Sequence, residues 1–128
     1  MPTENSESKE ARVQAGVLEE KDWEIHAAVA PQPGDIVVEK HRVSAFFGSD
    51  LDMILRSNDI ETLVLFGLIT GGVVLGTLLD AFDADYRVIV LKDLCRDQDP
   101  DAHDCVVEKV SPRYATVVTS ADFLEMLG

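Results

Sequence analysis

Positive charge is scarce in this chain. Of its 128 residues, 11 are Lys or Arg and 24 are Asp or Glu, which gives a formal net charge of −13. Nucleic acids and anionic membrane surfaces are bound by clusters of Lys and Arg. The composition therefore argues against both, and we expect a protein with neither a nucleic-acid nor a membrane partner.

Long apolar runs and cysteines are also few. The longest apolar run falls far short of the roughly 20 residues that a membrane-spanning helix needs. No charged-then-apolar signal peptide opens the chain, so we expect a cytoplasmic protein. The two cysteines, Cys95 and Cys105, are then predicted to be free thiols, because disulfide bonds are rare inside cells.

The chain does have enough apolar sequence for a core. Hydrophobic residues make up 46% of it, which excludes wholesale disorder, and its length suits one domain. Residues 1–22 are polar and mixed in charge without a sustained period, so they are predicted to be disordered or weakly helical. The folded domain is expected over residues 23–128.

The stretch Glu61–Tyr86 carries the main pattern. It begins with the unbroken apolar run Leu63–Leu68, which is typical of a strand buried on both faces. After a break at Thr70–Gly72, apolar residues recur at spacings of three and four, which predicts an amphipathic helix. In such units ligands bind at the carboxyl end of the strand, and the helix start favours an anion or a developing oxyanion. We therefore expect the functional site at this turn.

The rest of the chain alternates in the same way. Strands are predicted over Asp35–Glu39, Arg87–Leu91 and Ala115–Val118, and helices from Ser49 to Ser57, from Asp99 to about Val110, and from Thr119 to Leu127. Alternating strands and helices pair in parallel through right-handed crossovers. The predicted fold is an α/β helix–sheet–helix sandwich with a mostly parallel sheet.

Three segments resemble the isochorismatase-like, or cysteine hydrolase, superfamily. They read VVEKHRVSAFFGSDLDMIL, LVLFGLITGGVVLGTLLDAF and YRVIVLKDLCRD. The family's pattern is a Lys-x-x-x-Ser-Ala-Phe loop, a strand leading into Gly-x-x-Thr-x-x-Cys-Val, then Asp-Ala-x-x-x-x-Tyr and a strand ending in Asp. The resemblance begins near Glu24 and implies a Rossmann-like hydrolase without a cofactor, which assembles as a homo-oligomer. Its small-molecule substrates would be amides, carbamoyl compounds or vinyl ethers.

The same resemblance implies a set of site residues. The family's catalytic set is an Asp at the end of the first strand, a Lys, and a Cys at the helix start. Lys40 matches the family lysine and Thr70 the motif threonine, which puts the nucleophile position at Val73. A non-proline cis peptide is expected between Leu68 and Ile69, with the backbone N–H groups of Ile69 and Val73 forming the oxyanion hole.

Two members of that catalytic set are missing here. Val73 has no sulfur, and the family's first strand, which ends in Asp, has no counterpart upstream of Trp23. Acyl transfer needs a thiolate, and the family's isochorismatase branch needs the Asp as an acid. The prediction is a hydrolase-family domain that is impaired or inactive as this chain. The alternative is a non-catalytic assembly subunit or a gene fragment.

Other residues leave two interpretations open. Lys40 is either a site residue or an ordinary solvated lysine. Phe46 and Phe47 either line a substrate pocket with Thr70 or close the core. Cys95 follows a predicted strand and could be a substitute nucleophile, but the acidic residues around it disfavour its thiolate.

His103 lies one helical turn from Asp99, which would permit two metal ligands on one helix face. The alternative is a surface or structural histidine, and no metal site is predicted. The Thr70–Gly72 turn is not a dinucleotide or Walker fingerprint. A flavodoxin-like nucleotide-binding module would share the alternation of strands and helices, but it explains none of the three motifs.

Overall fold

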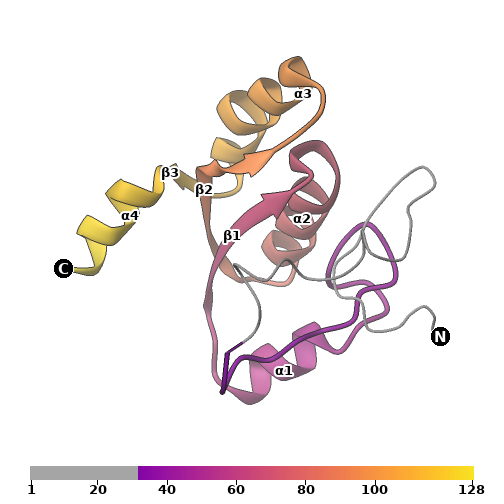
Figure 1. Ribbon diagram of the computed structural model, residues 1–128. Coiled ribbons are helices and arrows are strands. Elements are labelled where there is room, and N and C mark those ends of the chain that lie inside the picture. Colours follow the sequence, from indigo (N-terminus) through magenta and orange to yellow (C-terminus); the bar gives the residue numbers. More distant parts are fainter. Residues whose placement is uncertain (1–31) are drawn as a thin grey trace.

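Three parallel strands form the centre of the computed structural model, which describes residues 32–128. Strand β1 (Thr62–Leu68) pairs with β2 (Arg87–Arg96), and β2 pairs with β3 (Thr116–Val118). The order β1-β2-β3 leaves β2 in the middle and the other two strands at the edges of this sheet (Figure 1). The predicted α/β fold with a parallel sheet is confirmed.

Helices fill the connections and flank the sheet. They are α1 (Leu51–Ser57), α2 (Leu75–Asp83), α3 (Pro100–Cys105) and α4 (Ser120–Leu127), with π-helical turns at Thr70–Val74 and Val106–Val110 and a 3-10 turn at Ser111–Arg113. In Figure 1, α2 and α4 lie on opposite sides of strand β2. Within the described residues, no helix combines the length and the apolar character that crossing a membrane requires.

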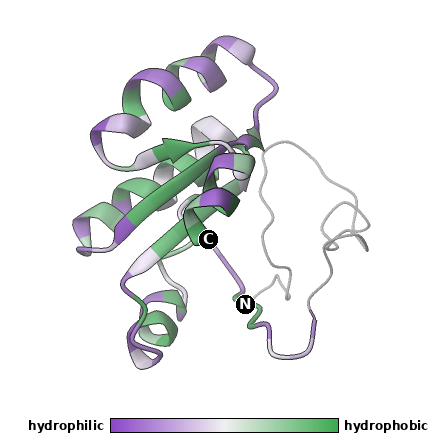
Figure 2. Cartoon of the chain, turned by 90° about the vertical axis from the view of Figure 1, so that its left-hand side faces the viewer, coloured by the Kyte–Doolittle hydropathy of each residue, from purple (hydrophilic) through white to green (hydrophobic). Residues whose placement is uncertain are grey.

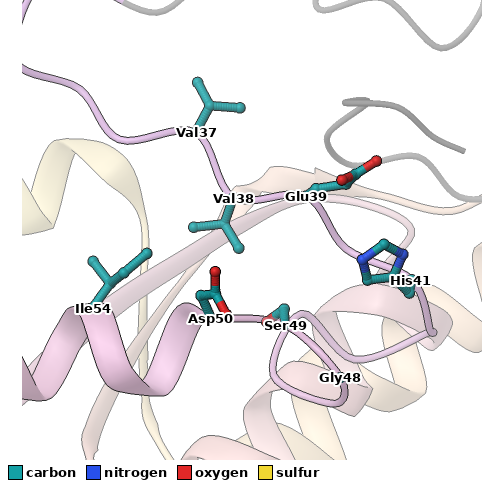
Figure 3. A pocket seen from close by; sticks show the side chains of 8 residues that line it. All are labelled: Val37, Val38, Glu39, His41, Gly48, Ser49, Asp50 and Ile54. Carbon is teal, nitrogen blue, oxygen red and sulfur yellow. The ribbon is translucent and has the colours of Figure 1, made fainter. Parts of the chain in front are cut away.

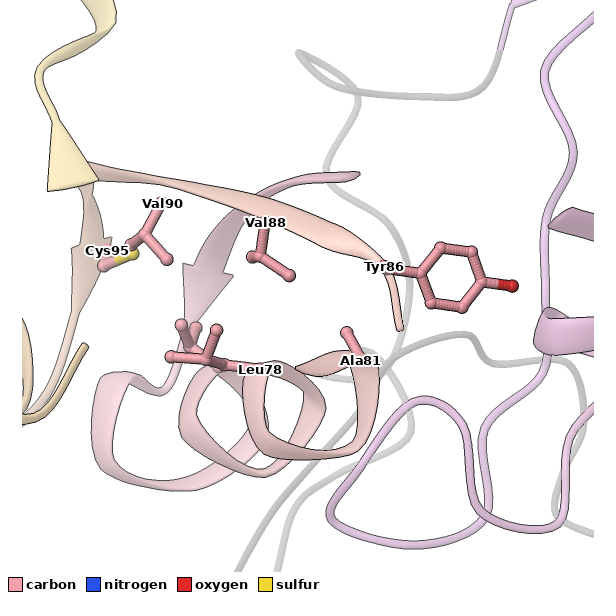
Figure 4. Close-up of a cluster of buried hydrophobic side chains, with 7 residues drawn as sticks. Leu78, Ala81, Tyr86, Val88, Val90 and Cys95 are labelled. Carbon is pink, nitrogen blue, oxygen red and sulfur yellow. The ribbon is translucent and has the colours of Figure 1, made fainter. Parts of the chain in front are cut away.

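The core lies between α2 and the sheet. Leu78 and Ala81 are one turn apart on the face of α2 that meets Val88 and Val90 of β2, and all four side chains are buried (Figure 4). Residues two apart on a strand share a face, which explains why both valines of β2 point toward the same helix. Figure 2 shows mainly hydrophobic strands among helices of mixed character.

Strand β1 is less buried than its sequence predicts. Leu63 and Leu65 pack against the core, but Phe66 and Leu68 are 58% and 64% exposed. An unbroken apolar run indicates burial on both faces only where other elements cover both faces. Here the face that carries Phe66 and Leu68 is not covered in this way, so the expectation of burial on both faces is wrong.

The predicted first strand is also wrong. Asp35–Glu39 has no strand conformation, and the side chains of Ile36 and Val37 are 60% and 51% exposed. A strand needs a hydrogen-bonded neighbour, and none of the described strands pairs with this segment. The disorder or weak helicity predicted for residues 1–22 lies outside the described residues.

Strand β2 is longer than predicted because its ladder with β1 is interrupted. Leu65 pairs with Val90, but the next pair joins Gly67 to Cys95, so β2 contributes extra residues between the two pairs. Gly67 has φ +127° at this irregularity, a conformation that residues with a Cβ rarely adopt. The irregularity extends β2 to Arg96 and brings the residues after it beside the end of β1.

Candidate functional site

The carboxyl end of β1 leads into the turn at which the sequence predicts the site. The peptide bond between Leu68 and Ile69 is cis, at the place where the family resemblance puts such a bond. Residues Thr70–Val74 then form one π-helical turn that continues into α2. The strand–turn–helix order is therefore as predicted, and the turn is the part of the molecule in which a ligand is expected.

The start of the helix already holds a carboxylate of the chain itself. The Gly71 N–H donates to Oδ2 of Asp97 over 2.8 Å. The N–H groups of Gly72 and Val74 donate to the carbonyl oxygen of Ile69, over 3.0 and 3.2 Å. These three bonds use neither the Ile69 amide nor the Val73 amide, which are the two donors that the resemblance assigns to an oxyanion.

Asp97 is the first residue after β2. Its Oδ1 accepts a hydrogen bond from the Asp99 N–H over 3.0 Å. This bond, followed by the one from the Gly71 N–H, holds the pKa of Asp97 below its ordinary value. The carboxylate meets the positive end of the turn, where negative charge is stabilised.

The hydroxyl of Thr70 is held by a side chain of α3. Thr70 is completely buried, and its Oγ1 lies 2.8 Å from Nδ1 of His103 in α3. His103 therefore contacts the predicted site residue Thr70 directly. Asp99 is the other residue of the possible metal pair. Its carboxylate instead caps α3 by accepting hydrogen bonds from the N–H groups of Asp101 and Ala102. Within residues 32–128, no three His, Cys, Asp or Glu side chains gather as metal ligands would.

The sequence patterns do not predict Asp97 or His103 at this turn. A usable signal existed for Asp97, because the ends of adjacent parallel strands meet at one edge of a sheet. This signal for Asp97 is missed because the predicted strand ends at Leu91, whereas β2 continues past the interruption in its ladder with β1 to Arg96. No comparable signal identified His103, whose contact depends on how α3 packs against the turn.

The loop that contains Lys40 and the Ser-Ala-Phe motif packs against the start of α2. The Ala45 N–H donates to Oγ1 of Thr77 over 2.9 Å. A Cβ added to Gly76 would lie 3.4 Å from Cγ1 of Val43, so the loop approaches the helix closely at a glycine. Lys40 is half-buried and is three residues from Val43, at most about 11 Å along the chain.

The remaining predicted site residues differ in their environments. Phe46 packs against the core, with its ring centroid 5.7 Å from that of Tyr86, whereas Phe47 is 66% exposed. Val73 is half-buried in the turn. Catalytic roles for Lys40 and Val73, and a substrate pocket that includes the two phenylalanines, stay predictions.

A small hollow lies beside the Lys40 segment. It has a volume of about 270 Å³ and lies between the extended chain around Val38 and the start of α1 (Figure 3). Side chains on either side of Lys40 line it, namely Glu39 and His41, together with Asp50 across the hollow. The segment that carries the predicted lysine thus borders a space open to small molecules.

The two cysteines have different surroundings. Cys95 is buried in the core, where desolvation raises the pKa of its thiol, and its Sγ donates to the Leu91 carbonyl oxygen over 3.4 Å. Cys105 is exposed on α3. Both are free thiols, as predicted. A buried thiol with a raised pKa is a poor nucleophile, which argues against Cys95 as a substitute for the missing sulfur.

Sequence comparison connects this geometry to known proteins. A family model described as the Isochorismatase domain matches residues 1–122. The chain is 37% identical over 118 residues to the ureidoacrylate amidohydrolase RutB of Azorhizobium caulinodans, covering 90% of this chain and 52% of that protein. It is 34% identical over 100 residues to the maleamate amidohydrolase of Pseudomonas putida, covering 78% and 47%. The chain spans about half the length of these curated relatives.

Solved structures share the fold. An isochorismatase-like hydrolase from Alkaliphilus metalliredigens superposes with a TM-score of 0.78 at 28% identity, covering 82% of this chain and 58% of that one. The N-carbamoylsarcosine amidase from Thermoplasma acidophilum superposes with a TM-score of 0.65 at 41% identity, covering 76% and 55%. The similarity to these structures includes more than half of each of the compared chains.

Proposed function

Because the chain belongs to the isochorismatase family, we propose that it binds a small amide, carbamoyl compound or vinyl ether, and that the turn Ile69–Val74 receives the carbonyl group of the amides and carbamoyl compounds. Relatives named as amidohydrolases support the amide and carbamoyl classes. The Ile69 and Val73 N–H groups are the proposed donors to the carbonyl oxygen. Lys40 is the proposed charged group beside it, on the loop that packs against the start of α2.

We propose further that this chain binds such compounds without cleaving amides through a covalent intermediate. The observation that carries this proposal is Val73, which stands at the first turn after β1. An aliphatic side chain can neither attack a carbonyl carbon nor hold a proton for transfer. Binding of a carbonyl group by the turn and attack by a nucleophile are thus separate functions. This chain is proposed to have carbonyl binding only.

The first test uses maleamate and ureidoacrylate, the compounds in the relatives' names. Binding to the purified chain is measured by calorimetry, and turnover is measured as released ammonia. We expect binding without ammonia release, and weaker binding by Lys40→Ala. The matched control is Lys109→Ala, which removes an exposed lysine from the π-helical turn after α3. Ammonia release that Lys40→Ala abolishes would contradict the proposed loss of activity.

A second test places sulfur at the turn. Val73→Cys puts a thiol where the helix start stabilises its anion, so we expect iodoacetamide to alkylate it faster at pH 7 than an ordinary cysteine. Val110→Cys is the matched control, since Val110 is also a half-buried valine in a π-helical turn. Peptide mapping separates both from Cys95 and Cys105. Equal alkylation rates for the two new thiols would argue against an anion-binding turn at Val73.

The second candidate function is a non-catalytic subunit that assembles with copies of itself. The observation that favours it is the exposed apolar pair Phe66 and Leu68 on the edge strand β1. Exposed apolar surface and an unpaired strand edge both favour association. Native mass spectrometry of the full chain tests it, with a homo-oligomer as the expected result and a monomer at micromolar concentration as the result that rejects it.

A further inference from the structure

We propose that His103 is a positioning residue of the candidate site, which holds the turn Thr70–Val74 in shape through its contact with Thr70. This inference rests on the proposed function, because it concerns the same turn. His103 need not touch a ligand for this role. It lies on α3, on a different element from the strand and helix that the turn connects.

The first part of the argument is the contact itself. Thr70 opens the turn, is wholly buried, and has its Oγ1 2.8 Å from Nδ1 of His103. A buried hydroxyl without a partner is unfavourable, so the turn is most stable where the histidine can reach it. Nδ1 can accept from the hydroxyl or donate to it, depending on the tautomer. The bond can form in either case.

The second part is that the next residue is tied to the same region. Gly71 donates to the carboxylate of Asp97, and a Cβ on Gly71 would lie 3.0 Å from that carboxylate and 3.9 Å from the Cβ of Ala102. Ala102 precedes His103 in α3. Two consecutive residues of the turn are therefore attached to α3 and to the connection before it.

The third part is what these attachments hold in place. Thr70 and Gly71 lie between Ile69 and Val73, whose N–H groups are the proposed donors to a carbonyl oxygen. Donors stabilise developing charge only where they are already aimed at its position. Fixing Thr70 and Gly71, two of the three residues between Ile69 and Val73, limits how far the amides can move apart, so loss of the His103 contact should loosen the turn locally.

Amide hydrogen exchange of the full-length chain tests this proposal without any ligand. We expect His103→Ala and Thr70→Val each to speed exchange at Gly72 and Val74, whose N–H groups donate to the Ile69 carbonyl oxygen, by about fivefold, the factor that corresponds to one neutral hydrogen bond. Both variants remove the same bond, so the double variant should match the singles instead of multiplying their effects. The exposed His41, changed to alanine, is the control and should leave the turn unchanged.

A conservative variant separates positioning from general stability. Asparagine can place a polar atom close to Nδ1, so His103→Asn should restore slow exchange, whereas His103→Gln should not. The core amides of Val88 and Val90 report the stability of the sheet in the same experiment. If turn and core amides speed up in equal proportion, if the singles multiply, or if His103→Ala changes nothing at the turn, the proposal is wrong.

A binding measurement links the result to the site. Maleamate should bind His103→Ala about fivefold more weakly than wild type, and His103→Asn about as well as wild type. If wild type binds none of the tested compounds, the proposed function fails, while exchange still decides whether His103 holds the turn. If wild-type binding is retained and His103→Ala binds equally well, the positioning role is rejected and the proposed function stands.

Discussion

The two faces of strand β1 have similar apolar sequences but different surroundings. On one face, Val88 and Val90 lie buried against Leu78 of α2, and Leu65 packs beside them. On the other face of β1, Phe66 is largely exposed. Apolar residues at strand spacing therefore predict a sheet, whereas the neighbouring elements determine which of these residues are buried and stabilise the sheet.

The largest effect on the free energy of unfolding is expected for a residue packed between α2 and the sheet. Leu78 is fully buried in α2, and Leu78→Ala should lower the free energy of unfolding by about 2–5 kcal/mol, because it removes apolar contacts and leaves a cavity. Chemical denaturation monitored by circular dichroism measures the loss. Leu124→Ala is the matched control on α4, where the side chain is exposed, and should stay within about 0.5 kcal/mol of wild type. Equal losses for both would remove the distinction between the faces.

A smaller effect on the free energy of unfolding is expected at Tyr86, which precedes β2 and belongs to the same core. Tyr86 is buried, and its hydroxyl donates to Oδ1 of Asp52 over 2.6 Å. Tyr86→Phe should therefore cost about 1 kcal/mol of unfolding free energy, the usual contribution of one hydrogen bond. A double-mutant cycle with Asp52→Ala, which removes the acceptor, checks that the loss belongs to this contact. Additive losses in the cycle would show that it does not.

The same tyrosine gives a spectroscopic check. Burial, and then the bond to Asp52, raise the pKa of Tyr86 above its ordinary value. Ultraviolet titration should show the Tyr86 phenol ionising at higher pH than a free tyrosine, in a step that Tyr86→Phe removes. A titration in which this step falls at the ordinary tyrosine pKa would contradict the burial of the hydroxyl.

The open face should respond differently. Phe66→Gln is expected to change the free energy of unfolding by at most about 0.5 kcal/mol, because the side chain gains little from folding. The neighbouring Leu65→Gln puts an amide against the core and should cost several times more. If association uses the open face, Phe66→Gln should also shift the native mass spectrum toward monomer. A large stability loss for Phe66→Gln would show that this face is covered in solution.

Much of the fold could be predicted because its signals are local. The apolar run of β1, the spacing of α2, and the Asp99-Pro100 start of α3 all lie within a few residues of the elements that they predict. The same is true of the cis bond after Leu68, since the motif that places it is contiguous. Local patterns are sufficient where an element's conformation depends mainly on its own residues.

The failures have a non-local cause. Asp35–Glu39 has strand-like residues but no pairing strand among those described, and the Phe66 side chain lies on the face of β1 that stays largely exposed. The contacts of Thr70 with His103 and of Gly71 with Asp97 join residues 33 and 26 positions apart. No periodicity in a single sequence encodes such pairs, so the His103 contact could not be predicted, and Asp97 could be placed only from the rule that adjacent parallel strands end at one edge of a sheet.

The smallest effect on the free energy of unfolding is expected at Asp97, the first residue after β2. The lowered pKa of Asp97 means that its carboxylate favours the folded state at pH values above the carboxyl's ordinary pKa. This contribution is lost as the pH falls through the lowered folded-state value. Asp97→Asn should therefore be less stable than wild type at pH 7, with a difference that shrinks as the pH falls below the ordinary carboxyl pKa. Denaturation at pH 7, 4 and 2.5 measures it.

Asp104→Asn is the matched control, because it removes one charge from an exposed position of α3. Asp97 is only half-buried, so solvent screening keeps its contribution well below that of Leu78. Asp97→Asn also removes a charged partner from the Gly71 N–H, and hydrogen exchange at Gly71 should rise at pH 7 but not in the control. A difference between Asp97→Asn and wild type that stays the same from pH 7 to pH 2.5 would contradict this prediction, because a contribution from the charge must decline as the carboxylate is protonated.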